Sequence, residues 1–312
     1  MWRFFYNLLS LMEFKTTQKN KKNIAFFIKT NPEKMTQLFN QELTEELYKK
    51  QVTDFFDQRQ NNYDTRYSIE RGIRLVELTP IEKGQKILDI ATGTGIAAIE
   101  ASKKLNKTGQ ILAVDFSSGM LKTAIKKIKQ EQLNNIELMQ ADVDYLSLTD
   151  NSFDVILCSS ALPWFTNISA NLRQWYSWLK VGGIVAFSCY SENAFLTPII
   201  VRLCATMYGI DLPNWNQPLG TPEKCYQILE KAKFREIKIT TEQLGAYISL
   251  EEAKNWWQGN PTWINPKGNP LQLLSDKQLQ TLKRAYDQEI ETLATLKGVW
   301  QDITTFFVIA RK

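Results

Sequence analysis

The segment DIATGTG, residues 89–95, combines an acidic residue with two closely spaced glycines. Glycine allows the backbone to adopt a positive φ and to approach a ligand closely, and the amide end of a following helix attracts a carboxylate. Asp89 is placed either to reach an ammonium group or to order the loop. This combination predicts a binding loop for a charged small molecule.

Two further acidic residues follow the next two apolar runs of the chain. Asp115 comes after residues 110–114 and is placed to accept hydrogen bonds from two ribose hydroxyls. Asp142 and the backbone of Val143 come after residues 136–139, where they are suited to bind an adenine amino group. The three acids together predict a ligand that contains adenosine.

A dinucleotide site is the main alternative for this loop. GTGIAA satisfies the pattern G-x-G-x-x-A, and Asp115 lies 20 residues after Gly95, so an NAD(P)-dependent oxidoreductase remains a candidate. Three features argue against it. Asp89 stands where dinucleotide binders normally have apolar residues, Asp142 adds a third acid, and two strands close the chain where a second mononucleotide half would be expected.

The elements that position these residues alternate between strands and helices. Strands are predicted at 86–90, 110–114, 136–139, 155–159, 184–189, 236–241 and 304–310. Helices are predicted at 36–63, 68–78, 96–105, 119–129, 170–179 and 222–232. This order predicts an α/β fold whose parallel sheet is covered on both faces and binds its ligand at the carboxyl ends of the strands. Residues 190–219 and 249–296 interrupt the pattern and, with the first 60 residues, are the predicted lid.

The net charge of +5 comes from the start of the chain. Residues 1–34 carry 7 basic and 2 acidic residues, which leaves 38 − 7 = 31 basic and 33 − 2 = 31 acidic residues in the remainder. A body without net charge has no general attraction for a phosphate backbone, so no nucleic-acid partner is predicted. The apolar run 1–12 is too short to span a bilayer. We expect this run either to make weak contact with a membrane surface or to dock on the rest of the protein.

The chain contains no histidine, which excludes Ser-His-Asp and Cys-His catalysis and histidine metal sites. The cysteines Cys158, Cys189, Cys204 and Cys225 have no CxxC spacing, so no metal site is predicted. Reduced, buried thiols of this kind indicate a cytoplasmic protein.

The motifs ILDIATGTG, AVDFSSGML, QADVDYL, FDVILCSSALPWF and LKVGGIVAFSC occur in the order of a class I S-adenosylmethionine-dependent methyltransferase. The chain resembles especially the ubiquinone/menaquinone-biosynthesis-like group, also called methyltransferase type 11, over about residues 55–190. This resemblance implies a Rossmann-like, seven-stranded, mostly parallel sheet with a reversed last strand, N-terminal helices and inserted lid segments. It implies S-adenosyl-L-methionine as cofactor and S-adenosyl-L-homocysteine as product.

The resemblance also implies a role for each residue of the motifs. The residues around the methionine part of the cofactor are Asp89, Ala91, Gly93 and Gly95, of which Ala91 replaces a common glycine. Asp115 binds the ribose, Phe116 and Met120 flank the adenine, and Asp142 and Val143 lie at its edge. Ser159 faces the sulfonium, and Tyr63 closes over the cofactor.

Methyl transfer is an in-line displacement, in which alignment and desolvation can accelerate the reaction without a proton-transfer residue. Pro163 stands where related sequences often have histidine, which favours an acceptor that arrives nucleophilic, such as an amine, an enol or an acidic phenol. If a base is used, Tyr190 and Glu192 are the first candidates, followed by Asp211 and Tyr247.

Aromatic residues in the predicted lid suit a flat or hydrophobic acceptor that is methylated on N, O or C. The predicted acceptor-binding residues are Trp164, Trp215, Trp256, Trp257, Trp263 and Tyr247, although ordinary lid packing explains them equally well. The predicted partner is therefore a small-molecule methyl acceptor, with a non-catalytic scaffold as a further alternative. The predicted division is a helical extension at 1–60, a cofactor-binding core at 61–190, and acceptor-binding insertions with the closing strands at 191–312.

Overall fold

The computed structural model describes residues 32–312 except 265 and 267, with side chains from residue 45 onward. The chain divides into two compact units, residues 1–47 and 48–312, and helix α3 (Pro32–Arg59) includes residues of both. The predicted interfacial run 1–12 lies outside the described residues. Within the described part of the chain, no helix has the length and apolar character needed to cross a bilayer. The predicted domain boundaries at residues 60 and 190 stay a prediction.

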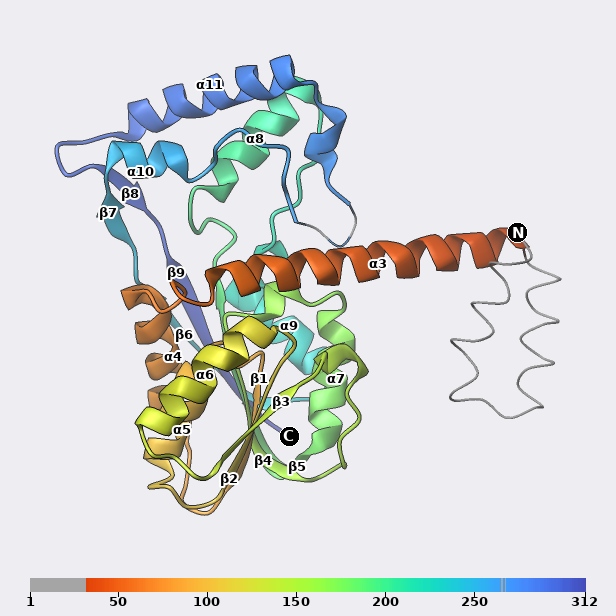
Figure 1. The fold of residues 1–312 in the computed structure, drawn as a ribbon, viewed down its shortest axis with the longest axis vertical. Coiled ribbons are helices and arrows are strands. Elements are labelled where there is room, and N and C mark those ends of the chain that lie inside the picture. The colour runs from red at the N-terminus through yellow and green to blue at the C-terminus, as the bar shows by residue number, and fades with distance from the viewer. Residues whose placement is uncertain (1–31, 265, 267) are drawn as a thin grey trace. The chain divides into compact units, whose positions relative to one another are not determined.

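A seven-stranded sheet forms the centre of residues 48–312 (Figure 1). Its strand order is β3-β2-β1-β4-β5-β9-β6, and only β9 runs antiparallel to its neighbours β5 and β6. The strands are β1 (Lys86–Ile90), β2 (Gln110–Asp115), β3 (Ile136–Gln140), β4 (Phe153–Ser159), β5 (Leu179–Tyr190), β6 (Arg235–Gln243) and β9 (Thr304–Arg311). The predicted α/β fold, with a mostly parallel sheet and a reversed last strand, is confirmed.

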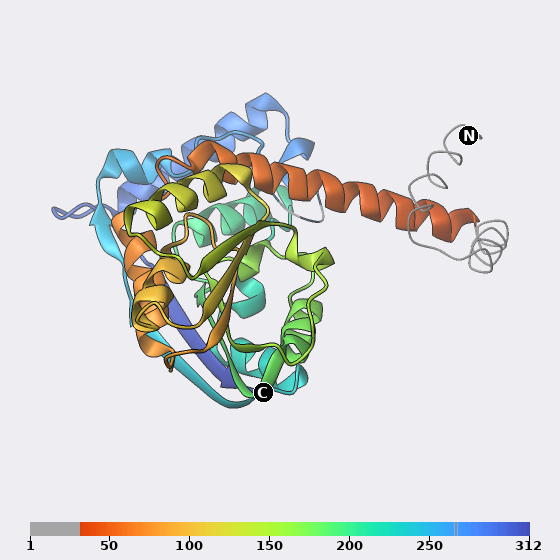
Figure 2. The ribbon, with the colours of Figure 1, turned by 60° about the horizontal axis from the view of Figure 1, so that its bottom comes forward.

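Helices cover both faces of this sheet (Figure 2). Ile87 of β1 packs in the layer that contains α4 and α5, whereas Leu88 and Ile90 pack against α7 and α9. The helices are α4 (Arg66–Leu78), α5 (Ile96–Lys104), α6 (Ser118–Gln130), α7 (Ile168–Trp178) and α9 (Pro222–Lys231). Because a strand covered on both faces buries side chains on each of them, β1 is buried from Ile87 to Ile90 and β4 from Val155 to Cys158, and most of these residues are apolar.

Polar side chains begin most of these helices. The hydroxyls of Thr65, Ser117 and Thr221 and the amide of Asn167 each accept a hydrogen bond from a backbone N–H in the first helical turn. Such caps satisfy N–H groups that have no partner inside the helix. Helix starts are therefore encoded locally, and the predicted helix bounds agree with the structure to within a few residues.

The two predicted lid insertions form regular structure, which the sequence analysis did not predict. They contain α8 (Thr197–Tyr208), α10 (Leu250–Asn255) and α11 (Asp276–Leu293), and the short strands β7 (Ala246–Ile248) and β8 (Val299–Gln301) flank the second insertion. We call these five elements the cap. Trp257, Trp263 and Tyr286 pack with α8 and α11 in a hydrophobic core of its own. The capping box of Ser275 and Gln278 was the sequence signal for α11.

Candidate active site

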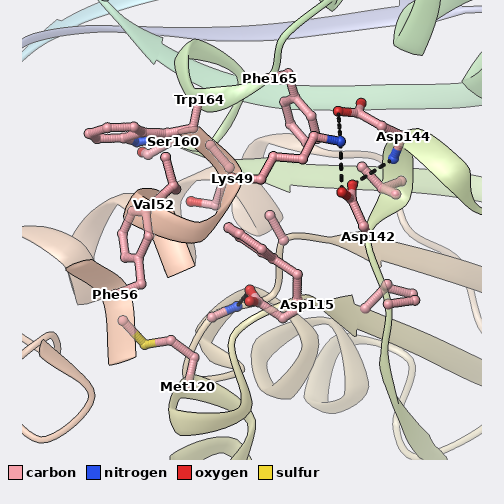
Figure 3. Close-up of a pocket in the computed structure, with 18 of the residues that line it drawn as sticks. Lys49, Val52, Phe56, Asp115, Met120, Asp142, Asp144, Ser160, Trp164 and Phe165 are labelled. Atoms are coloured by element: carbon pink, nitrogen blue, oxygen red, sulfur yellow. Dashed lines mark hydrogen bonds and ion pairs between the residues drawn. The ribbon is translucent and has the colours of Figure 1, made fainter. Parts of the chain in front are cut away.

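A cavity of about 780 Å³, including its open mouth, lies at the carboxyl ends of β1, β2 and β4. β1 and β4 are neighbours at the point where the strand order reverses, which is where open α/β sheets bind ligands. We call this space the inner cavity (Figure 3). Nine of the predicted cofactor residues line it: Tyr63, Ala91, Gly93, Asp115, Phe116, Met120, Asp142, Val143 and Ser159.

Asp115, the last residue of β2, joins two loops at the floor of the inner cavity. One carboxylate oxygen accepts a hydrogen bond from the Gly93 N–H at 2.8 Å, and the other accepts from the Ser117 N–H at 2.8 Å. Burial raises the pKa of Asp115 to about 6, although both backbone donors act in the opposite direction. Each carboxylate oxygen retains acceptor capacity that can be used by a ligand.

Asp89 and Gly95 do not line the inner cavity. Asp89 is 1% exposed and accepts a hydrogen bond from the Thr92 hydroxyl at 2.5 Å, while its second oxygen has no partner among the described residues. Burial raises the pKa of Asp89 to about 7. Gly95 begins α5 with a φ of 82°, and a Cβ there would lie 3.2 Å from the Cβ of Ala124. In the described structure both residues shape the loop.

Ala91 and Gly93 turn the loop with left-handed backbone conformations. Their φ angles are 53° and 58°. Glycine adopts this region without cost, whereas a residue with a Cβ is strained there. Ala91 therefore has a backbone conformation that glycine would adopt without strain, and its Cβ makes that conformation energetically costly.

A lysine on α3 pairs with two acids at one side of the inner cavity. The Lys49 ammonium lies 2.7 Å from a carboxylate oxygen of Asp142 and 2.8 Å from one of Asp144 (Figure 3). Burial alone would lower the pKa of Lys49, but the hydrogen bonds to the two carboxylates outweigh it and raise that pKa. Asp142 therefore has a cationic partner close to the place where an adenine edge was predicted.

The sequence analysis placed residues 1–60 in the predicted lid but named no side chain of α3 as part of the site. Tyr48, Lys49, Val52 and Phe56 all line it. Tyr48, Val52 and Phe56 recur every four residues, which is the spacing of one helix face. That stripe was visible in the sequence, but only the fold shows that it faces a cavity and not the hydrophobic core.

The last turn of α3 and the chain that follows it are tied to both cofactor loops. Asp57 accepts hydrogen bonds from the Ser117 hydroxyl at 2.5 Å and the Gly119 N–H at 2.9 Å. Asp64 accepts from the Thr94 hydroxyl at 2.5 Å and pairs with Lys127 at 2.8 Å. These contacts hold residues 57–64 across the loops that follow β1 and β2, with Tyr63 beside Gly93.

A second, larger cavity lies between the sheet and the cap, and we call it the outer cavity. Its volume is about 2110 Å³, including open solvent. All five predicted acceptor tryptophans line it: Trp164, Trp215, Trp256, Trp257 and Trp263. Four residues line both cavities: Phe56, Tyr63, Ser160 and Trp164. We call these four the junction.

The tryptophans of the outer cavity form a continuous aromatic wall. Trp215 stacks on Trp263 with ring centroids 4.2 Å apart and lies 6.0 Å from Trp164, which in turn contacts Phe56 at 5.5 Å. The indole N–H groups of Trp215 and Trp263 donate to backbone carbonyls, so the two rings are fixed in place. This wall runs from the cap to the junction.

The four candidate bases occupy different surroundings. Tyr190 lines the outer cavity, whereas Glu192 pairs with Lys224 at 2.5 Å and does not line either cavity. Tyr247 lies on β7, is exposed and packs on Trp300, and Asp211 is also exposed outside both cavities. Among the four, only Tyr190 lies where it could contact an acceptor in the outer cavity.

A family model described as the ubiE/COQ5 methyltransferase family matches residues 44–236. Aklanonic acid methyltransferase DauC of Streptomyces sp. (strain C5) is 31% identical over 194 residues, which cover 60% of this chain and 88% of that protein. Demethylmenaquinone methyltransferase of Staphylococcus aureus (strain JH9) is 27% identical over 177 residues, which cover 55% of this chain and 72% of that protein.

Two solved structures share the fold at low sequence identity. The YcgJ protein of Bacillus subtilis is 17% identical with a TM-score of 0.51, covering 80% of this chain and 99% of that one. The BH2331 protein of Bacillus halodurans C-125 is 19% identical with a TM-score of 0.52, and the match covers 78% of this chain and 99% of that one.

The family match extends over more than half of the chain and includes every motif on which the resemblance was based. It confirms the predicted enzyme class and cofactor, against the oxidoreductase alternative. The chain belongs to the ubiE/COQ5 methyltransferase family and is an S-adenosylmethionine-dependent methyltransferase.

Proposed function

We propose that the enzyme binds the methyl donor in the inner cavity and methylates an aromatic, quinone- or polyketide-type small molecule in the outer cavity. The observation that supports this division is the junction of Phe56, Tyr63, Ser160 and Trp164, which lines both spaces. A donor bound in the inner cavity and an acceptor bound in the outer cavity would therefore meet at the junction. In-line transfer requires this kind of alignment of the two reactants.

The inner cavity has the chemistry that the donor requires. S-adenosylmethionine supplies a methyl group on a positively charged sulfonium. Asp115, Asp142 and Asp144 provide three carboxylates against the single ammonium of Lys49, which favours a cationic ligand. In this proposal Asp115 accepts from the ribose hydroxyls, Phe116 and Met120 enclose the adenine, and Asp142 with Val143 binds its edge.

The acceptor class is supported by the aromatic wall and by the relatives. Trp164, Trp215 and Trp263 offer flat faces to a flat ligand. The names of two relatives refer to aklanonic acid and to demethylmenaquinone. In this proposal the wall holds the acceptor ring beside the junction and excludes water from the transfer. Tyr190 is the candidate base if the acceptor retains a proton.

The cysteines support the proposed cytoplasmic location. Cys158, Cys189, Cys204 and Cys225 are all buried and unbridged. Burial raises the pKa of Cys158 and Cys189 well above the ordinary value, so neither is a reactive thiolate. Such thiols fit a reducing compartment.

Calorimetric titration tests the assignment of the donor site. We expect the wild-type protein to bind S-adenosylhomocysteine and not NAD. Asp115→Asn should weaken S-adenosylhomocysteine binding about tenfold or more, because it removes a charged hydrogen-bond acceptor from the ribose. Asp150→Asn is the matched control, since Asp150 is exposed and lies outside both cavities.

Equal affinity of wild type and Asp115→Asn for S-adenosylhomocysteine would contradict this assignment. The acceptor class is tested separately, by transfer of an isotope-labelled methyl group from S-adenosylmethionine to the compounds of a whole metabolite extract. Label recovered only in polar, non-aromatic products would contradict the proposed acceptor.

A further inference from the structure

Arg71 is a buried cation that faces the outer cavity without a partner. It lies on α4, is 9% exposed and lines the cavity. Its Nε is buried without a hydrogen bond, and no ion pair to its guanidinium exists among the described residues. Arg74, one turn further along α4, pairs with both Glu77 and Glu242. The contrast marks Arg71 as a group that the protein itself leaves unsatisfied.

A buried charge without a partner is costly, so its presence needs an explanation. The guanidinium lies over the ring of Tyr190, whose centroid lies 5.1 Å from Cζ. Such a cation–π contact offsets part of the desolvation cost but leaves the Nε–H without an acceptor. Arginine presents these donors in a planar fork that matches a carboxylate or another anionic oxygen.

The two cavities have opposite charge. The outer cavity is lined by Arg59 and Arg71 and by no aspartate, glutamate or lysine among the described residues. The inner cavity is lined by three carboxylates and one ammonium. Trp257 also lines the outer cavity, and its indole N–H is a second buried donor without a partner. The outer cavity therefore offers unsatisfied donors and positive charge, whereas the inner cavity favours a cation.

We infer that the outer cavity binds the methyl acceptor as an anion, and that Arg71 is the residue that binds its anionic oxygen. This inference rests on the proposed function and narrows its substrate class to flat acceptors that carry a carboxylate or an ionised phenol or enol. Alkyl amines, which are cationic at neutral pH, are disfavoured. A bound anion thereby also supplies the counter-charge that Arg71 does not find among the described residues.

An anionic acceptor also removes the need for a histidine base. An electron pair of the acceptor forms the bond to the methyl carbon while the carbon–sulfur bond breaks, and that bonding pair stays on sulfur. When the anionic oxygen itself takes the methyl group, its negative charge and the positive charge of the sulfonium both disappear, and no proton has to be removed. When the carbon of an enolate takes the methyl group, the charges cancel in the same way, and the proton on that carbon is released to solvent afterwards. This balance agrees with a chain that contains no histidine.

Two pairs of probes test the inference by calorimetry in the presence of saturating S-adenosylhomocysteine. The first pair is 1-hydroxy-2-naphthoate and its neutral carboxamide, and the second is 2,4-dinitrophenolate and the neutral 2,4-dinitroanisole. We expect wild-type protein to bind at least one anion about tenfold more tightly than its neutral partner, as for a charged hydrogen bond. The pair that shows the preference distinguishes a carboxylate acceptor from a phenolate.

Variants assign the preference to Arg71. Arg71→Gln should reduce it to less than about twofold, whereas Arg71→Lys should keep part of it because the charge remains. Arg66→Gln is the control, since Arg66 lies on the same helix as Arg71, is exposed and lines neither cavity, and it should leave the preference unchanged. S-adenosylhomocysteine affinity should stay the same in all three variants, which shows that they are folded.

Equal binding of anion and neutral partner by the wild type, or no binding of either anion, would overturn the inference. So would a preference that persists in Arg71→Gln. Should a variant not fold, the wild-type comparison still decides the charge preference, and Arg71→Lys tests the residue. Failure of the wild type to bind S-adenosylhomocysteine would instead overturn the proposed function.

Discussion

Replacing Asp89 by asparagine should remove much of the pH dependence of the free energy of unfolding of the ligand-free protein. Asp89 is buried on β1, and burial raises its pKa from the ordinary 3.8 to about 7. The unfolded state therefore releases this proton at a lower pH than the folded state. Stability from this group is present at low pH and is lost as the pH rises through about 7.

The magnitude follows from the two pKa values. From about pH 5 to pH 7 the carboxyl is ionised in the unfolded chain but still protonated in the folded one. Each pH unit in this window changes the free energy of unfolding by about 1.4 kcal/mol, so Asp89 contributes roughly 2 to 3 kcal/mol. Asp115 adds a smaller term of the same sign, because burial raises its pKa to about 6.

Urea denaturation followed by circular dichroism at pH 5, 6.5 and 8 measures the effect. The wild type should be less stable at pH 8 than at pH 5 by roughly the sum of the two terms, whereas Asp89→Asn should keep only the smaller one. Asparagine has nearly the same shape and still accepts a hydrogen bond from the Thr92 hydroxyl, so the loop should be preserved.

Asp150→Asn is the control for the pH series, because Asp150 is exposed and its replacement should leave the wild-type dependence intact. The reasoning would be refuted if Asp89→Asn lost as much stability between pH 5 and pH 8 as the wild type. A wild type that became more stable over the same range would refute the sign of the effect.

Two further predictions concern the loop and the aromatic wall. Ala91→Gly should raise the free energy of unfolding, measured by urea denaturation, by about 0.5 to 1 kcal/mol, because glycine adopts the φ of 53° without strain. Ala101→Gly inside α5 is the comparison and should lower the free energy of unfolding by about 1 kcal/mol. A loss of stability in Ala91→Gly would contradict the reasoning. Trp215→Ala should weaken 1-hydroxy-2-naphthoate binding about tenfold and leave S-adenosylhomocysteine affinity unchanged, because Trp215 lines only the outer cavity. Trp300→Ala on β8, outside both cavities, should change neither titration, and equal losses in the two variants would count against the wall as an acceptor surface.

Most of the sheet and its helices could be predicted from local pattern. β1 is buried from Ile87 to Ile90 and apolar there except for Asp89, and Thr65, Ser117 and Thr221 are helix caps that act within one turn. The cap could not be predicted in this way. α8 begins with a proline in its first turn and lies in a region of prolines and tryptophans, so its helical face is stabilised by packing against α11 rather than by local pattern.

The sequence by itself determined the position of the donor loop along the chain, because an acid, a left-handed turn and a helix start are short-range features. It also excluded histidine chemistry. Only the tertiary structure decided that Asp89 is buried behind the loop, that α3 brings Lys49 to Asp142, and that Glu192 turns away to Lys224. The same holds for Arg71, one of many arginines in the sequence, since burial without a counter-ion depends on which distant segments surround it. Burial and partner choice are properties of the folded chain, and they decide the chemistry of both cavities.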